Sequence, residues 1–202
     1  MANNESGFTT SELFVVVAVI GIIAAMALPQ ALNSLNNYRV HSDASEIAGY
    51  LNVERMRAAY QAAPYALDVN GSTYAIEQLT PLTYNPLATP TSTSYTSQNP
   101  AVYDFGTQYL APEDTITNCL PSGVSVYPIP VTANPGTCGT PFQIYFNTRG
   151  LPVDSSGNAL ASGGMAIYLT NTNGMVDAVT VSSGGAVQVW NWVPRSSAWA
   201  LR

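Results

Sequence analysis

The 202-residue sequence contains no lysine, and its six basic residues are all arginines, at positions 39, 55, 57, 149, 195 and 202. Twelve acidic residues bring the formal net charge to −6. Nucleic-acid binding depends on basic patches that displace counterions from phosphates, and the sequence has no such cluster. A nucleic-acid partner is therefore disfavoured.

Charged residues of either sign are scarce. They make up 9% of the chain, against roughly 25% in an average soluble domain. Apolar residues reach 47%, so disorder driven by charge repulsion is disfavoured. The composition favours a packed or membrane-associated protein whose polar surface consists mainly of Ser, Thr, Asn and Gln.

Histidine and cysteine are almost absent. His41 is the only histidine and has no neighbouring ligand, so a structural role is expected, and Cys119 and Cys138 lack metal-ligand spacing. With no catalytic constellation in view, we expect no metal, no cofactor and no enzymatic activity. If this region is exported, the two cysteines should form a disulfide worth about 3 kcal/mol by chain entropy. If it is cytosolic, they should be free thiols.

One long apolar run dominates the N-terminal part of the chain. After the short polar segment 1–7, it extends from Phe8 to Leu28 and ends at Pro29. This length is close to the roughly 20 residues that span a bilayer as a helix. We therefore expect a transmembrane helix over residues 8–29.

The helical pattern continues beyond the apolar run, over residues 30–63. Val40, Ala44, Ile47 and Leu51 recur at helical spacing. We expect Glu54 and Arg57, three residues apart, to pair on the solvated face, and Pro64 to close the segment. A helix over 8–63 would be about 80 Å long, so membrane or other subunits must cover half of it.

From residue 64 to 202 the pattern changes to the period of two that is typical of strands. Asn70-Gly71 predicts a hairpin with a type I′ turn, and residues 80–100 read as a long exposed loop. Further strands are expected at Ala101–Phe105, Val124–Val131, Phe142–Phe146, Met165–Thr170, Val176–Ser182 and Ala186–Trp192. The predicted fold class is α+β, a long helix followed by an antiparallel β-sheet or sandwich domain.

Three ordinary interpretations of the apolar run must account for the carboxylate of Glu12 near its start. A secretory signal peptide has a basic n-region, which MANNESG lacks. A simple signal anchor explains the length but gains nothing from an acid, which is costly in a membrane helix. A buried core helix would need a second helix to cover it, and none is visible.

The complete N-terminal string resembles the start of type IV pilins and type II secretion pseudopilins. The matching features are Gly7 followed by Phe8, the acid Glu12 at the fifth position after Gly7, an apolar helix containing Gly21, and then Pro29. The leader departs from the family in carrying no Lys or Arg before the glycine.

The resemblance implies a role for each matching residue. Prepilin peptidase would cut between Gly7 and Phe8, and the new amine of Phe8 would be N-methylated. Glu12 would pair with the N-terminal amine of a neighbouring subunit during assembly, and Gly21 and Pro29 would mark where the helix loosens on packing. The protein would lie in the bacterial inner membrane with its C-terminal domain in the periplasm or outside the cell, and then join a pilus or pseudopilus.

The β part resembles the H-type minor pseudopilins and FimT-like minor pilins more loosely. The similarity rests on FQIYFNTRGLPV (142–153) and VDAVTVSSGGAVQVWNW (176–192). It implies a minor subunit that initiates or tips the filament, with a major subunit as the alternative. A DNA-binding or adhesive minor pilin also stays open, with Arg195 and Arg202 flanking Trp199 in the C-terminal segment, as does a membrane-anchored enzyme using Asp104 or Asp154.

Overall fold

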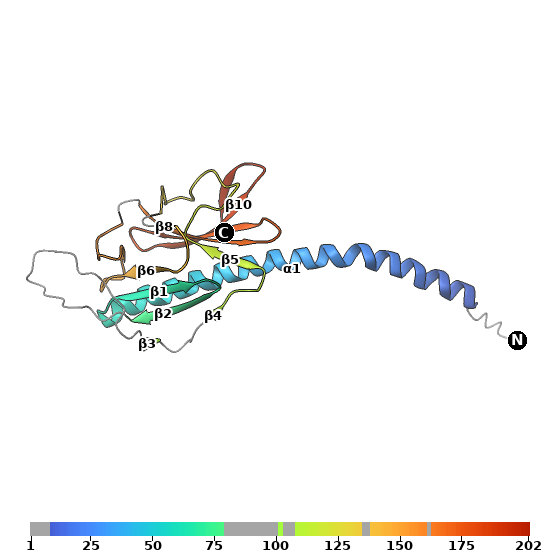
Figure 1. Ribbon diagram of the computed structural model, residues 1–202, viewed down its shortest axis with the longest axis horizontal. Helices are drawn as coiled ribbons and strands as arrows, with labels where there is room; N and C mark the ends of the chain where they lie inside the picture. The colour runs from blue at the N-terminus through green and yellow to red at the C-terminus, as the bar shows by residue number, and fades with distance from the viewer. Residues whose placement is uncertain (1–8, 79–100, 103–107, 135–137, 161–162) are drawn as a thin grey trace, which may run out of the picture.

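The computed structural model describes residues 9–78, 101–102, 108–134, 138–160 and 163–202. It has the predicted α+β fold, with one long N-terminal helix followed by two antiparallel sheets (Figure 1). The helix α1, Thr10–Gln61, ends where Ala62 adopts a left-handed conformation, just before Pro64. The predicted leader 1–7, residue 8 and the whole of the predicted loop at 80–100 lie outside the described residues.

The strands form two separate sheets. Sheet A has the order β3-β2-β1-β6-β7, with β4 also paired to β2, and sheet B has the order β11-β10-β9-β8-β5. The strands of sheet A are β1 Tyr65–Asn70, β2 Thr73–Gln78, β3 Ala101–Val102, β4 Gln108–Tyr109, β6 Phe142–Phe146 and β7 Pro152–Val153. The strands of sheet B are β5 Asp114–Thr117, β8 Gly164–Asn171, β9 Val176–Ser182, β10 Val187–Val193 and β11 Ala198–Leu201.

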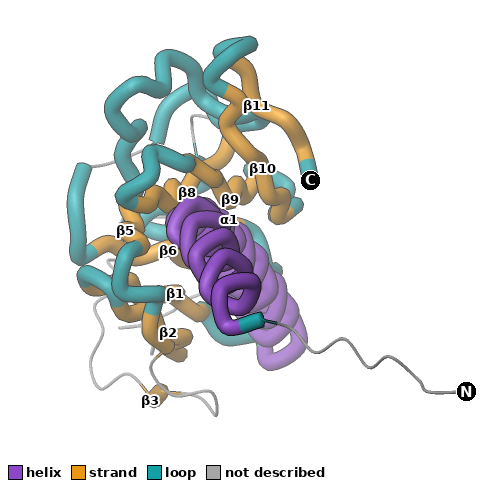
Figure 2. Tube along the Cα trace, turned by 90° about the vertical axis from the view of Figure 1, so that its right-hand side faces the viewer, coloured by secondary structure: helices purple, strands orange, loops and turns teal. Residues whose placement is uncertain are grey.

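The main core lies between the C-terminal half of α1 and the inner faces of both sheets. Figure 2 looks almost along the helix and shows strands of the two sheets beside it. The helix contributes Val40, Ala44, Ile47 and Leu51 at the spacing seen in the sequence. Alternate residues of the strands, such as Leu67, complete the core because successive side chains of a strand point to opposite faces.

A second apolar layer covers the outer face of sheet B. Trp199 packs against Trp192 and Tyr168, with ring centroids 5.3 and 6.0 Å away. The segment Val124–Val131, predicted as a strand, is irregular instead, and that prediction is wrong. Val124, Tyr127 and Val131 pack in the apolar clusters on the outer face of the sheet. Val126 and Ile129 are exposed.

The β1–β2 hairpin is present, but the predicted type I′ turn around Asn70-Gly71 is wrong. Asn70 pairs directly with Thr73, so the two loop residues are Gly71 and Ser72. Gly71 has φ 62°, and Ser72 is not among the described non-glycine residues with positive φ. Positive φ at the first central position alone is the pattern of a type II′ turn.

Arg55 ties the far end of α1 to both sheets. Its guanidinium donates to the Gly185 carbonyl in the β9–β10 turn. A Cβ on Gly150, in the β6–β7 turn, would lie 2.7 Å from the Arg55 carbonyl oxygen. The β6–β7 and β9–β10 turns therefore both contact Arg55, and each does so through a glycine, because a larger residue would collide there. The neighbouring Glu54, predicted on the solvated face, is wholly buried instead, and this burial raises the pKa of its carboxyl well above the usual value.

Candidate functional site

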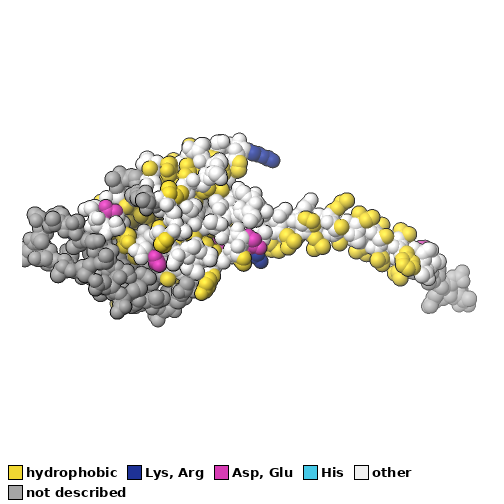
Figure 3. Space-filling view, in the orientation of Figure 1, with side chains coloured by type: hydrophobic (Ala, Val, Ile, Leu, Met, Phe, Trp, Pro, Cys, Tyr) yellow, Lys and Arg dark blue, Asp and Glu magenta, His cyan; other side chains and the backbone are white. Residues whose placement is uncertain are grey.

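The N-terminal half of α1 is an apolar surface with no cover. Every residue from 9 to 35 is exposed, and we call this segment the apolar arm. Figure 3 shows apolar side chains all along it, clear of the β domain. The arm belongs to a single N-terminal helix long and apolar enough to cross a membrane. Because an exposed apolar surface of this size is rare on soluble monomers, it marks a membrane or protein contact.

Glu12 forms a capping box at the start of the arm. Its Oε2 accepts hydrogen bonds from the backbone N–H and the hydroxyl of Thr9, both at 2.8 Å. In return, the Glu12 N–H donates to the Thr9 hydroxyl at 3.4 Å. Such reciprocal bonds satisfy amide donors that have no partner inside the helix. The carboxylate thus has a partner within its own chain, which the sequence reasoning missed although Thr-x-x-Glu is a capping pattern.

The other residues predicted from the N-terminal pattern differ in what the structure describes. The helix runs through Gly21 and Pro29 without interruption and arches gently (Figure 1). A Cβ on Gly21 would meet nothing within 4 Å. Loosening at these two positions on packing stays a prediction, and the cleavage residues Gly7 and Phe8 lie outside the described part of the chain.

A set of polar contacts fastens α1 to the β domain at the end of the arm and just beyond it, and we call it the polar collar. Its helix residues contact the segment before β5, the β8–β9 turn, β9 and the residue after β11. They are Asn33, Asn37, Arg39, His41 and Asp43. Arg39 pairs with Glu113 at 3.1 Å, and the Asn171 side-chain amide donates to the side-chain oxygen of Asn37 at 3.0 Å. The collar fixes where the bare arm begins.

His41 is the most deeply engaged member of the polar collar. Its Nδ1 bonds to the carboxylate of Asp177, which is wholly buried and also accepts from the Asn191 amide at 2.9 Å. Its Nε2 lies 2.7 Å from the Arg202 guanidinium. Arginine can only donate, so Nε2 accepts and the imidazole proton sits on Nδ1, facing Asp177. The expected structural role of His41 thus takes the form of a buried acid–histidine pair, which no local sequence pattern announced.

Asp43 of the polar collar faces a second acid, Asp114. Asp43 accepts a hydrogen bond from the Ala111 N–H at 3.0 Å, and Asp114, whose own N–H donates to the Ala111 carbonyl, is 6% exposed. Burial and the facing Asp43 carboxyl raise the pKa of Asp114 to about 7, while Arg39 lowers it in part. One carboxyl of this pair therefore keeps a proton well above the pH at which aspartate normally ionises.

Because the folded chain holds this proton on Asp114, we expect the stability of the fold to fall as the pH rises. Unfolding returns Asp114 to a pKa near 3.8, so the folded chain binds more protons between about pH 4 and 7. We expect the free energy of unfolding to fall by about 1–2 kcal/mol across this window, because solvent screens part of the repulsion. Asp114→Asn should remove the part of the decrease that Asp114 contributes, leaving the part that comes from the raised pKa of Glu54, whereas Glu113→Gln should retain both. Urea unfolding of the full chain in detergent micelles measures both, and an unchanged slope in Asp114→Asn would contradict the assignment.

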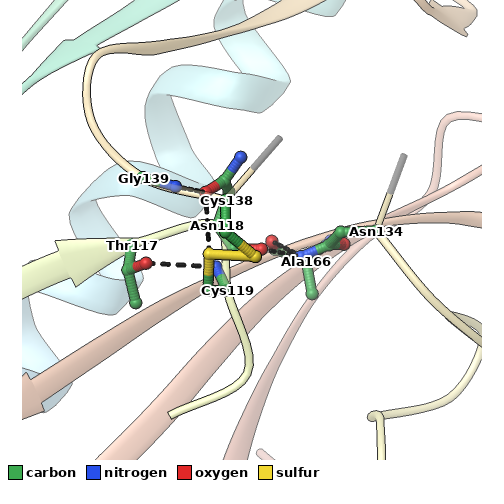
Figure 4. Close-up of a disulfide and its surroundings, with 7 residues drawn as sticks. All are labelled: Thr117, Asn118, Cys119, Asn134, Cys138, Gly139 and Ala166. Carbon is green, nitrogen blue, oxygen red and sulfur yellow. Dashed lines mark hydrogen bonds between the residues drawn. A yellow bond between two sulfur atoms is a disulfide. The ribbon is translucent and has the colours of Figure 1, made fainter. Parts of the chain in front are cut away.

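Cys119 and Cys138 form the disulfide expected for an exported chain (Figure 4). Their Cα atoms are 5.1 Å apart. The Asn118 side chain accepts from the Gly139 N–H at 2.9 Å, and the Asn134 amide accepts from the Ala166 N–H at 2.7 Å. The disulfide and these amides anchor the loop that covers sheet B.

The remaining residues considered from the sequence are those of the C-terminal segment and the aspartates Asp104 and Asp154. In the C-terminal segment with Arg195 and Arg202, residues Ala198–Leu201 form strand β11, Trp199 packs in the outer layer and Arg202 is bound to His41. The Asp154 carboxylate accepts from the backbone N–H groups of Ser156 and Asn158 within its own turn, and Asp104 lies outside the described residues. Within the described ranges, no group of three His, Cys, Asp or Glu residues is placed to hold a metal ion.

Comparisons of the chain with family models, with curated proteins and with solved structures find no match. The class that the structure defines is therefore an α+β protein with one candidate membrane-spanning helix, a polar collar and a disulfide-bonded β domain.

Proposed function

We propose that the protein is a non-enzymatic structural subunit of a type IV pilus-like filament or a type II secretion pseudopilus. The observation that supports this most is the apolar arm, which carries the one carboxylate Glu12 at its outer end. An arm of this kind is stable only in lipid or against other apolar helices. Filament assembly would move it from the first environment to the second.

The precursor would span the bacterial inner membrane once, with the β domain on the outer side. Prepilin peptidase would cleave after Gly7, and Phe8 would become the methylated N-terminus. The new amine would supply the cation that Glu12 of a neighbouring subunit needs in the apolar filament core, where an unpaired charge is costly. The polar collar would hold the β domain at the filament surface.

Within this class we favour a minor subunit that starts or tips the filament, with a major subunit as the alternative. The loose similarity of 142–153 and 176–192 to H-type pseudopilins and FimT-like pilins supports this choice. A DNA-binding role gains no support, because Arg39 pairs with Glu113 and Arg202 is bound to His41.

N-terminal mass spectrometry of the protein expressed with a prepilin peptidase tests the proposal. We expect a mature chain that begins at N-methylated Phe8. A Gly7→Val control, which replaces the glycine of the proposed cleavage site, should keep the full leader. An intact Met1 in the unmodified chain, or a cut after Ala27 or Ala31, would overturn the proposal.

A further inference from the structure

A cavity of about 510 Å³ opens in the β domain, far from the apolar arm. It lies where β1, β6 and β7 of sheet A meet Asn118 and Pro141, which flank the disulfide-closed loop, and the start of β8. Its volume falls within the roughly 300–1,000 Å³ that is typical of sites for small ligands. None of the roles proposed above uses this cavity.

The alternation of β1 and β6 directs a row of polar side chains into the cavity. Leu67 and Ile144 point into the main core, so their neighbours point to the opposite face. Asp68 pairs directly with Gln143, and Tyr145 is two residues further along β6. Directly paired residues have Cβ atoms about 5 Å apart, so the three side chains form one continuous polar surface.

The hydrogen bonds define what this surface offers a ligand. The Tyr145 hydroxyl donates to the Gln143 side-chain carbonyl, which leaves the Gln143 amide nitrogen as a donor beside it. Asp68 is half-buried, and among the described residues its carboxylate has no hydrogen-bond partner. Asp154, which follows β7 in the same lining, is already committed to the amides of its own turn. One open acceptor therefore stands beside one open donor.

The charge of the cavity excludes anions. All six arginines of the chain are in the described part, and none of them lines the cavity. Two carboxylates and no base would repel a phosphate, a carboxylate or a nucleic acid. A simple ammonium group is also a poor match, because it only donates and would leave the Gln143 amide without an acceptor.

We propose that this cavity binds a neutral saccharide. Each sugar hydroxyl both donates and accepts, so two adjacent hydroxyls can satisfy Asp68 and Gln143 together. The ring of Tyr145, on the same face and in the same lining, offers an apolar surface to the C–H face of the sugar. A ligand that leaves the Asp68 carboxylate or the Gln143 amide without a hydrogen bond binds more weakly. The site is therefore selective for a polyhydroxylated molecule. The proposal stands apart from filament assembly, since a single subunit contains the complete site.

Saturation-transfer NMR on the full chain tests the proposal. The protein should be held in a polyoxyethylene detergent, because glycoside detergents would compete for the site. The probes are a panel of neutral hexoses, N-acetylhexosamines and their disaccharides, with N-acetylneuraminic acid as the anion and putrescine as the cation. We expect saturable transfer to at least one neutral sugar and none to the anion.

Two variants locate the site. Asp68→Ala should weaken binding of that sugar at least about tenfold, and Asn70→Ala, an exposed change on the same strand, should not. Thermal unfolding establishes that both variants are folded, and Asp68→Asn, which preserves the side-chain shape, replaces the alanine variant if it is not. Transfer to putrescine alone, no saturable signal from any sugar, or sugar binding unaffected by the change at Asp68 would each overturn the proposal.

Discussion

Glu12→Ala is expected to enter the membrane and be cleaved like the unmodified protein, yet to appear in filaments at least about tenfold less. Without the carboxylate, the amine of the neighbouring subunit would be buried in the apolar filament core with no counter-charge. Each 1.4 kcal/mol lost there corresponds to a tenfold change in an equilibrium, and breaking a buried ion pair costs more than this. Quantitative immunoblotting of sheared filaments against the membrane fraction measures the effect.

The capping box calls for a matched control, because Glu12→Ala also removes the hydrogen bonds to Thr9. Thr9→Ala loses the two hydrogen bonds of the Thr9 hydroxyl, at a cost of about 1 kcal/mol in helix stability, but retains the carboxylate and its bond from the backbone N–H of residue 9. We expect Thr9→Ala to assemble nearly normally. If the two variants assemble equally poorly, the carboxylate acts through its own helix, and the pairing between subunits is wrong.

His41→Ala is expected to lower the free energy of unfolding by about 3–5 kcal/mol. The change leaves the buried carboxylate of Asp177 with only the Asn191 amide as hydrogen-bond partner, and a buried charged group that loses a partner has a cost of this size. The loss is a large fraction of the roughly 5–15 kcal/mol by which an ordinary domain is stable. Urea unfolding of the full chain in micelles, followed by tryptophan fluorescence, measures it.

Two further variants separate this cause from simple loss of packing. Arg202→Ala removes the exposed partner of His41 and should cost less than about 1 kcal/mol. Adding Asp177→Asn to His41→Ala should restore part of the loss, because it removes the buried charge. A loss in His41→Ala below that of Arg202→Ala, or no recovery in the double variant, would contradict the assignment.

The elements with strong local patterns could be predicted from the sequence. The helix repeats apolar residues at 3.6-residue spacing, and the strands Phe142–Phe146 and Val176–Ser182 have the bounds that were expected. Short strands such as β5 were missed, since four residues carry little pattern. Val124–Val131 has the composition of a strand, but both of its end residues are buried on the outer face of sheet B instead of within a strand.

The polar part of the candidate site depends on contacts between distant parts of the chain. His41 and Asp177 are 136 residues apart, and nothing near either residue indicates that they meet. Helical spacing shows which residues share a face of the helix, but not how far the sheets wrap around the helix. For this reason the sequence suggested that Glu54 is solvated. The Thr9–Glu12 box was within reach, because Thr-x-x-Glu before an apolar run is a local signal.

The two fastenings of α1 also decide how the protein bears mechanical load. The polar collar holds the helix at one end of the β domain, and Arg55, closed in by Gly150 and Gly185, holds it at the other. Tension along the arm would therefore act in shear, on many contacts at once, rather than peel the sheets from the helix one strand at a time. Helix and sheets would bear a pull along the helix axis as a single body.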